Sequence, residues 1–194
     1  MTSSNLIFLT GYMACGKTTL GTALAGSAGV MFIDLDAEIE RLAGCSIARY
    51  FNDYGEKAFR ELEADTLRCV IAEHYGRQQP VIIACGGGTP CHGDNQQQML
   101  AAGRVIWLRA SRERTLARLL DAAPGSRPLM AGLDAQSIAR RIDHDLEIRT
   151  PHYSRAHHIF DSSYLDTPGE VARTTADFIE RFLDQYPAPD DFTL

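Results

Sequence analysis

Lysine is scarce in this 194-residue sequence, where only Lys17 and Lys57 occur among 19 basic residues. Its five cysteines are odd in number and form no C-x-x-C pair, which argues against a disulfide framework or a zinc ribbon. No run approaches the roughly 18 apolar residues of a membrane span, and no basic leader precedes the first apolar run. We therefore expect a cytoplasmic protein with reduced thiols.

Positive charge is also in deficit, because the net charge is −6. An acidic surface argues against general attraction to nucleic acid or to anionic membranes, so an anionic ligand would need local positive groups. Apolar residues make up 45% of the chain, which is enough for one domain over residues 1–194 without disulfides or metal. We expect that domain to be a monomer.

Several short apolar runs separated by helical patterns predict a parallel sheet with helices on both faces, the α/β class. The expected strands are 6–10, 30–33, 81–84, 104–108 and 158–160. A final helix is expected over about 168–185, followed by a disordered tail over about 187–194. The segment 121–132 is rich in proline and glycine, which is typical of a surface loop and predicts a lid.

A phosphate-binding motif follows the first predicted strand, because residues 11–18 match G-x-x-x-x-G-K-T in full before a predicted helix. Its glycines let backbone N–H groups face phosphates, and the helix N-terminus adds a favourable dipole. Lys17 would reach the β- and γ-phosphates, and Thr18 would offer its hydroxyl to Mg²⁺. A turn that binds nothing, or a nucleotide switch without transfer activity, remains possible on this motif alone. The predicted nucleotide-binding residues here are Gly11, Met13, Ala14, Cys15, Gly16, Lys17, Thr18 and Thr19.

Two carboxylates, Asp34 and Asp36, alternate at the end of the second predicted strand. If the strand continues, both project toward the mouth of the sheet, where ligands of such sheets bind. Carboxylates beside a phosphate loop suggest the handling of a metal and a hydroxyl. The alternative for Asp36 is a cap on the following helix.

Arg149 extends the apolar face of a predicted helix. That face is formed at steps of 4, 4 and 3 by Ile138, Ile142, Leu146 and Arg149. An inward guanidinium needs an anion, which is either a carboxylate of the protein or a carboxylate of the substrate.

Arg60 and a run of glycines are the remaining candidates. Arg60 lies in a predicted helix over about 56–73, one turn before Glu63, so an ordinary ion pair on the helix explains it. The glycines at positions 86, 87 and 88 follow a buried strand, which indicates either a tight turn or a backbone that a ligand approaches closely.

With these motifs in view, the sequence resembles the shikimate kinase family across nearly its whole length. The resemblance implies the P-loop NTPase fold, a three-layer sandwich with sheet order 2-3-1-4-5 and a lid. It also implies ATP-dependent phosphorylation of the 3-hydroxyl of shikimate, a step of aromatic amino acid biosynthesis. The motifs that carry it are the P-loop at 11–18, Phe-Ile-Asp-Leu-Asp at 32–36, Phe-Arg-Glu-Leu-Glu at 59–63, the triple glycine, Arg127-Pro128-Leu129, and Arg149-x-x-x-Tyr153.

The resemblance assigns roles that the patterns alone leave open, including a substrate role for Arg60. Catalysis would rest on Lys17, Asp36 and Arg127, where Arg127 enters from the lid to stabilise charge on the transferring phosphoryl group and also contacts the nucleotide. Thr18 would hold Mg²⁺ directly and Asp34 through water. Shikimate would be bound by Asp36 at its hydroxyls, by Arg60 and Arg149 at its carboxylate, and by Gly86, Gly87 and Gly88.

The sequence departs from the family pattern in two places. Ala14 stands where the family's P-loops usually have glycine, and a positive φ there would strain alanine by roughly 1 kcal/mol. The lid does not align cleanly with the family's adenine-stacking arginine, and Arg118 is the candidate for that role. The rivals are another small-metabolite kinase, such as a gluconate kinase, and a nucleotide-binding module without transfer activity.

Overall fold

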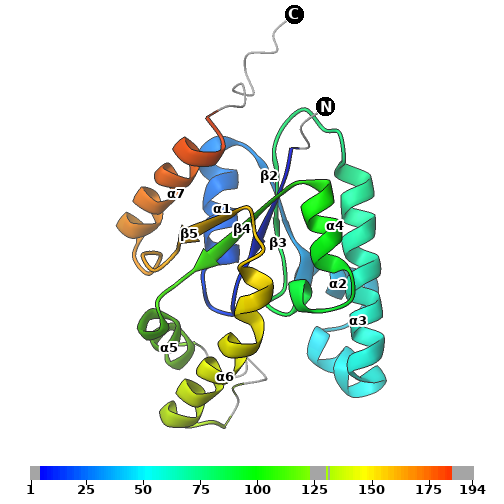
Figure 1. Ribbon diagram of the computed structural model, residues 1–194, viewed down its shortest axis with the longest axis vertical. Coiled ribbons are helices and arrows are strands. Elements are labelled where there is room, and N and C mark those ends of the chain that lie inside the picture. Colours follow the sequence, from blue (N-terminus) through cyan, green and yellow to red (C-terminus); the bar gives the residue numbers. More distant parts are fainter. Residues whose placement is uncertain (1–4, 123–129, 131, 185–194) are drawn as a thin grey trace, which may run out of the picture.

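The computed structural model describes residues 5–122, 130 and 132–184 (Figure 1). Most of the predicted lid, including Arg127, lies outside the described residues, as does the whole predicted tail at 187–194. Within the part that is described, no helix combines the length and the apolar character that a membrane span requires.

A parallel sheet of five strands forms the middle layer, in the order β2-β3-β1-β4-β5. This confirms the predicted sheet, and each predicted strand lies within one residue of an observed one. All pairings between neighbouring strands are parallel. The strands are β1 Leu6–Thr10, β2 Met31–Asp34, β3 Val81–Ala84, β4 Arg104–Arg109 and β5 His158–Asp161.

Helices cover both faces of the sheet, with α1 and α7 on one side and α3 and α4 on the other (Figure 1). A short 3₁₀ helix, η1 Thr89–Cys91, follows β3. The α-helices are α1 Lys17–Ala28, α2 Leu35–Ala43, α3 Ile47–His74, α4 Asn95–Ala102, α5 Arg112–Leu120, α6 Ala135–Tyr153 and α7 Pro168–Phe182.

Strand β1 is buried along its whole length. Because successive side chains of a strand point to opposite faces of the sheet, β1 contributes to a core on each side. Leu6 and Phe8 pack into the core shared with α2, α3 and α4. Ile7 and Leu9 pack into the core shared with α1 and α7. The continuous apolar run is therefore the signature of a central strand with a separate core on each side.

Two predicted helix boundaries are wrong. The helix expected from position 56 begins at Ile47 instead, and Gly55 interrupts it with φ 79° and ψ 175°. The predicted start therefore marks the second of two helical segments joined at a kink. Helix α7 ends at Phe182 rather than at 185, and its start is held by a capping box between Thr167 and Glu170.

Candidate active site

The phosphate loop runs from β1 into α1 and depends on left-handed backbone at several positions. Gly11 has φ 136° and Gly16 has φ 98°. A Cβ on Gly11 would lie 2.4 Å from the carbonyl oxygen of Leu108, so only glycine fits there. Ala14 has φ 59° and is the one non-glycine residue with positive φ in the described part of the chain. The condition for strain at Ala14 is therefore met.

The side chain of Lys17 packs against the phosphate loop. Its ammonium Nζ donates to the carbonyl oxygens of Gly11 and Tyr12, both at 2.9 Å. Cys15, which belongs to the loop, is buried. The ammonium is thus held at the start of α1, where backbone N–H groups and the helix dipole favour an anion.

Asp34 connects the loop to β2 and α2. Its Oδ2 accepts a hydrogen bond of 2.8 Å from the hydroxyl of Thr18, and its Oδ1 accepts from the backbone N–H groups of Asp36 and Ala37. The strand ends at Asp34 and α2 begins at Leu35, so the condition under which both carboxylates would project from one strand is not met. The suggested helix cap at Asp36 is wrong, because Asp34 caps α2.

Asp36 lies in the first turn of α2 beside the glycine run. A Cβ on Gly86 would lie 2.9 Å from its Oδ1. Although Asp36 is open to solvent, desolvation by the surrounding protein raises the pKa of its carboxyl group, and the charge of Asp34 raises it further, while Lys17 opposes the shift. A raised pKa makes this carboxylate a better proton acceptor than an ordinary aspartate.

The three glycines after β3 bring together the predicted acceptor-side residues, one beside each glycine. Gly86 lies against Asp36, as described above. A Cβ on Gly87 would lie 3.5 Å from Nη1 of Arg149, and a Cβ on Gly88 would lie 3.0 Å from Nη1 of Arg60. We call Gly86, Gly87 and Gly88 the glycine wall. Its backbone lies close to one carboxylate and two guanidinium groups from three different helices.

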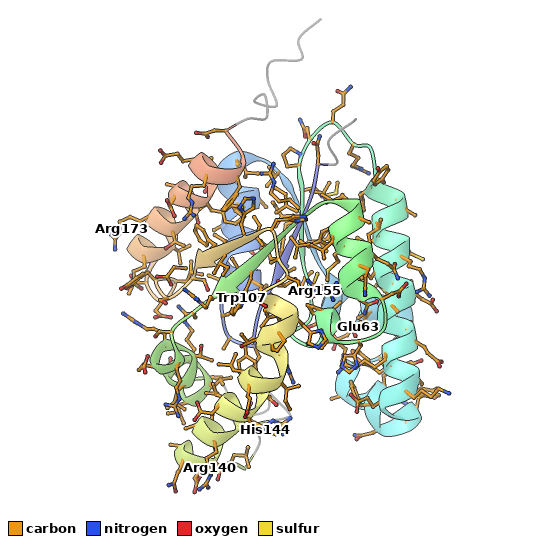
Figure 2. The ribbon with its side chains drawn as sticks, viewed as in Figure 1. Glu63, Trp107, Arg140, His144, Arg155 and Arg173 are labelled. Carbon is orange, nitrogen blue, oxygen red and sulfur yellow. The ribbon has the colours of Figure 1, made fainter. Side chains whose placement is uncertain are left out.

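The ion pair predicted between Arg60 and Glu63 is present, at 2.9 Å between Nη1 and Oε2. Glu63 lies on the inner side of α3 (Figure 2), is only 1% exposed, and accepts a second hydrogen bond of 2.7 Å from the hydroxyl of Thr89. Glu63 thereby links α3 to η1, directly after the glycine wall. The ion pair orients the guanidinium of Arg60 toward the wall, so the structural role is compatible with ligand binding.

Arg149 projects inward from α6, as its place on the apolar face predicts, and its side chain is 19% exposed. Its Nη2 lies 3.5 Å from Oδ2 of Asp145, one helical turn earlier, and its guanidinium lies over the ring of Tyr12, 5.5 Å from the centroid. The hydroxyl of Tyr153 donates to the carbonyl oxygen of Gly87 at 2.5 Å. The internal partners of Arg149 are therefore the carboxylate of Asp145, the ring of Tyr12 and the hydroxyl of Tyr153. Sequence reasoning named Tyr153 only as part of a motif and missed Asp145 and Tyr12.

A cavity of about 620 Å³ extends from the glycine wall along the phosphate loop to α5. Arg118 lines its far end and donates to the carbonyl oxygens of Ala14, Ser162 and Ser163 at 3.0 to 3.1 Å. It also pairs with Asp166. The guanidinium is thus engaged by the protein, and it ties the phosphate loop to the segment after β5. The predicted residues that line the cavity are Met13, Ala14, Gly16, Lys17, Thr18, Thr19, Asp36, Gly87 and Arg118.

Comparison with known proteins decides the family. The shikimate kinase family model matches residues 13–180 of this chain. The chain belongs to the shikimate kinase family. A shikimate kinase from Parabacteroides distasonis is 39% identical over 165 residues, which cover 85% of this chain and 92% of that protein.

Solved structures of family members share the fold. A shikimate kinase from Bacteroides thetaiotaomicron is 35% identical, with a TM-score of 0.84 over 92% of this chain and 98% of that one. A shikimate kinase from Acinetobacter baumannii, solved in complex with shikimate, is 28% identical, with a TM-score of 0.76 over 93% of both chains. The gluconate kinase alternative is not favoured, because the matching family model and these relatives are all shikimate kinases.

Proposed function

We propose that this protein transfers the γ-phosphoryl group of ATP to the 3-hydroxyl of shikimate and releases shikimate 3-phosphate and ADP. The observation that carries the proposal is the glycine wall, where Asp36, Arg60 and Arg149 meet within reach of the phosphate loop. Family membership supports the same activity.

The acceptor side fits a small molecule that bears both a carboxylate and hydroxyls. Arg60 and Arg149 present two guanidinium groups to the wall from α3 and α6, and such groups bind a carboxylate through paired hydrogen bonds. Asp36 faces the opposite end of the wall and accepts hydrogen bonds from hydroxyls. Because the glycines have no side chains, the ring of the substrate can lie directly against the backbone.

The phosphoryl transfer needs a new bond from the 3-oxygen of shikimate to the γ-phosphorus, while the bond to the β,γ-bridging oxygen of ATP breaks. The hydroxyl gives up its proton, and Asp36, with its raised pKa, accepts it or orients the hydroxyl for attack. Lys17 would leave the loop carbonyls and follow the negative charge on the phosphates.

The metal side of the site fits Mg²⁺. Thr18 and Asp34 supply hard oxygen donors at the start of α1, and their hydrogen bond of 2.8 Å holds them together. No cluster of three or more metal-ligating side chains occurs among the described residues, so the ATP phosphates and water would complete the coordination. Bound Mg²⁺ would neutralise charge on the β- and γ-phosphates.

Two arginines complete the proposal on the nucleotide side. Arg127 would enter from the lid to stabilise the transferring group, and its position lies outside the described residues. Arg118 would lie beside the adenine, at the far end of the cavity. The enzyme would work as a cytoplasmic monomer whose partners are ATP and shikimate, rather than nucleic acid or membrane.

Release of ADP with and without shikimate tests the proposal. ADP should appear only when shikimate is present, and Lys17→Ala should abolish it. Lys57→Ala is the matched control, because Lys57 is the only other lysine and is exposed on α3. Turnover that ignores shikimate but depends on another metabolite would refute the substrate, and an active Lys17→Ala protein would refute the role of the loop.

A further inference from the structure

A buried carboxylate, Asp145, lies between the phosphate loop and Arg149, although no motif contains it. Asp145 is 5% exposed and Tyr12, the second residue of the loop, is 3% exposed. The hydroxyl of Tyr12 donates to Oδ2 of Asp145 at 2.9 Å, across 133 positions of sequence. On the other side, Nε of Arg141 donates to Oδ1 at 3.0 Å. Both carboxylate oxygens therefore have partners.

Burial makes these partners necessary. A buried carboxylate is strongly destabilising unless it is paired and hydrogen-bonded. Burial, and then the charge of Asp145, raises the pKa of Tyr12 far above its ordinary value, so its hydroxyl stays protonated and acts as a donor. Arg141 is 41% exposed, and solvent screens its charge. Oδ1 of Asp145 is thus held by Arg141 near the surface, and Oδ2 is held by Tyr12 and Arg149 on the inner side.

The contact between Asp145 and Arg149 leaves the arginine with donors to spare. The separation of 3.5 Å between Nη2 and Oδ2 is longer than a charge-assisted hydrogen bond of about 2.8 Å. Nη1 is the nitrogen next to Gly87 in the glycine wall. One side of the guanidinium thus faces the protein carboxylate while the other faces the acceptor site.

Tyr12 joins this arrangement to the ATP side of the enzyme. Its ring lies under the guanidinium of Arg149, and its carbonyl oxygen accepts a hydrogen bond of 2.9 Å from Lys17. A single residue of the phosphate loop thus contacts the phosphate-binding lysine, the buried carboxylate and the arginine of the acceptor site.

We propose that Asp145 is a positioning residue, which Tyr12 holds in place and which sets the orientation of Arg149 for the substrate carboxylate. The proposal rests on the proposed function, because Arg149 must bind that carboxylate. Without Asp145, the guanidinium of Arg149 would keep its contacts with the ring of Tyr12 and the hydroxyl of Tyr153 but would lose its charged partner. The substrate would then have to select the productive rotamer from a wider set. We expect this loss to exceed the gain in positive potential that removal of a carboxylate brings, so that shikimate binds more weakly.

Asp145→Asn tests the proposal because it keeps size and shape while it removes the charge. We expect the KM for shikimate to rise roughly 2- to 30-fold, with the KM for ATP and kcat nearly unchanged. Asp143→Asn is the matched control, since Asp143 lies on the same helix but is exposed and pairs with Arg112 outside the site. An unchanged or lower KM for shikimate in Asp145→Asn would overturn the proposal.

A neutral substrate separates positioning from general structural damage. We expect the carboxamide analogue of shikimate to lose little when Asp145 is changed, because Arg149 has no carboxylate to bind in that ligand. Equal losses for shikimate and the carboxamide would mean that Asp145 only supports the fold, and would overturn the proposal.

Tyr12→Phe keeps the ring and removes only the hydroxyl that Asp145 accepts from, so it also serves if Asp145→Asn fails to fold. Its KM for shikimate should rise, and the double variant should lose less than the sum of the single effects, as expected for residues that act through one another. Full additivity, or a Tyr12→Phe protein with unchanged KM, would refute the link. Loss of all dependence on shikimate in the unmodified enzyme would instead refute the proposed function.

Discussion

At the scale of single residues, backbone conformation and charge decide how the phosphate loop works. Ala14 has φ 59°, and Arg118 donates to its carbonyl oxygen at 3.1 Å. The left-handed conformation strains alanine by roughly 1–2 kcal/mol, so the surrounding hydrogen bonds have to hold it. The position is therefore a place where the chain gives up stability within its ligand site.

Ala14→Gly should stabilise the protein. The substitution releases roughly 1–2 kcal/mol of backbone strain in the folded protein. It also costs roughly 0.4–1 kcal/mol of stability, because glycine gives the unfolded chain more conformational freedom. The free energy of unfolding should therefore rise by about 0.5–1 kcal/mol. Urea unfolding measures this change, because a higher midpoint concentration of urea at an unchanged m-value reports greater stability. Ala117→Gly in α5 is the control and should destabilise by about 1 kcal/mol, because its backbone is helical. A destabilised Ala14→Gly protein would contradict the strain.

Asp36→Asn should abolish phosphoryl transfer and yet raise the melting temperature at neutral pH. The pKa of Asp36 is raised from 3.8, so the folded protein holds this proton more tightly than the unfolded chain. Stability is then lost as pH rises from the pKa of this carboxyl group in the unfolded chain through its pKa in the folded protein. Removal of the charge restores that stability. The gain in melting temperature should disappear at a pH below the pKa of the unfolded chain, where the carboxyl group is protonated in both states.

The matched control for this effect is Asp34→Asn. Asp34 caps α2 and accepts from Thr18, so its replacement should lower the melting temperature at neutral pH. A melting temperature that falls equally in both variants would show that the surroundings do not destabilise the ionised carboxylate of Asp36.

At the scale of elements, the short segment after β3 organises residues from three helices. The glycine wall contacts Asp36 of α2, Arg60 of α3 and Arg149 of α6. Glu63 then ties α3 to η1 through Thr89. The glycines are needed here for space rather than for unusual dihedral angles, since Gly88 has φ −93°.

Gly88→Ala should therefore act through Arg60 alone. The new Cβ would lie 3.0 and 3.1 Å from the two terminal nitrogens of the guanidinium, so Arg60 must move away from the wall. We expect kcat/KM for shikimate to fall roughly 10- to 100-fold with little change in stability. Steady-state kinetics measure this. Gly26→Ala, where nothing lies within 4 Å of the new Cβ, is the control and should retain full activity.

At the scale of the whole molecule, segments far apart in the sequence meet around the cavity. Arg118 connects α5 to the phosphate loop, 104 residues earlier, and to the segment after β5, 44 and 45 residues later. These hydrogen bonds to backbone carbonyls join the phosphate loop to the segment after β5.

Arg118→Ala should weaken both the fold and the response to ATP. Three carbonyl oxygens and Asp166 would lose a charged donor, which should destabilise the protein by about 1–3 kcal/mol. The rise in melting temperature with saturating MgATP should also shrink, since stabilisation follows the ligand concentration relative to Kd. Arg173→Ala is the control, because Arg173 points away from the protein on α7 (Figure 2). An unchanged thermal shift would argue against a nucleotide role for Arg118.

The sequence by itself determined the strands, the phosphate loop and the glycine run, because apolar periodicity and glycine spacing are local properties that one element carries alone. The order of the sheet came from the family resemblance. Only the tertiary structure decided which aspartate caps α2, where α3 begins, and the φ of Ala14. It also decided that Asp145 meets Tyr12, because a contact across 133 positions depends on how α6 packs against the loop, and no local pattern records that packing.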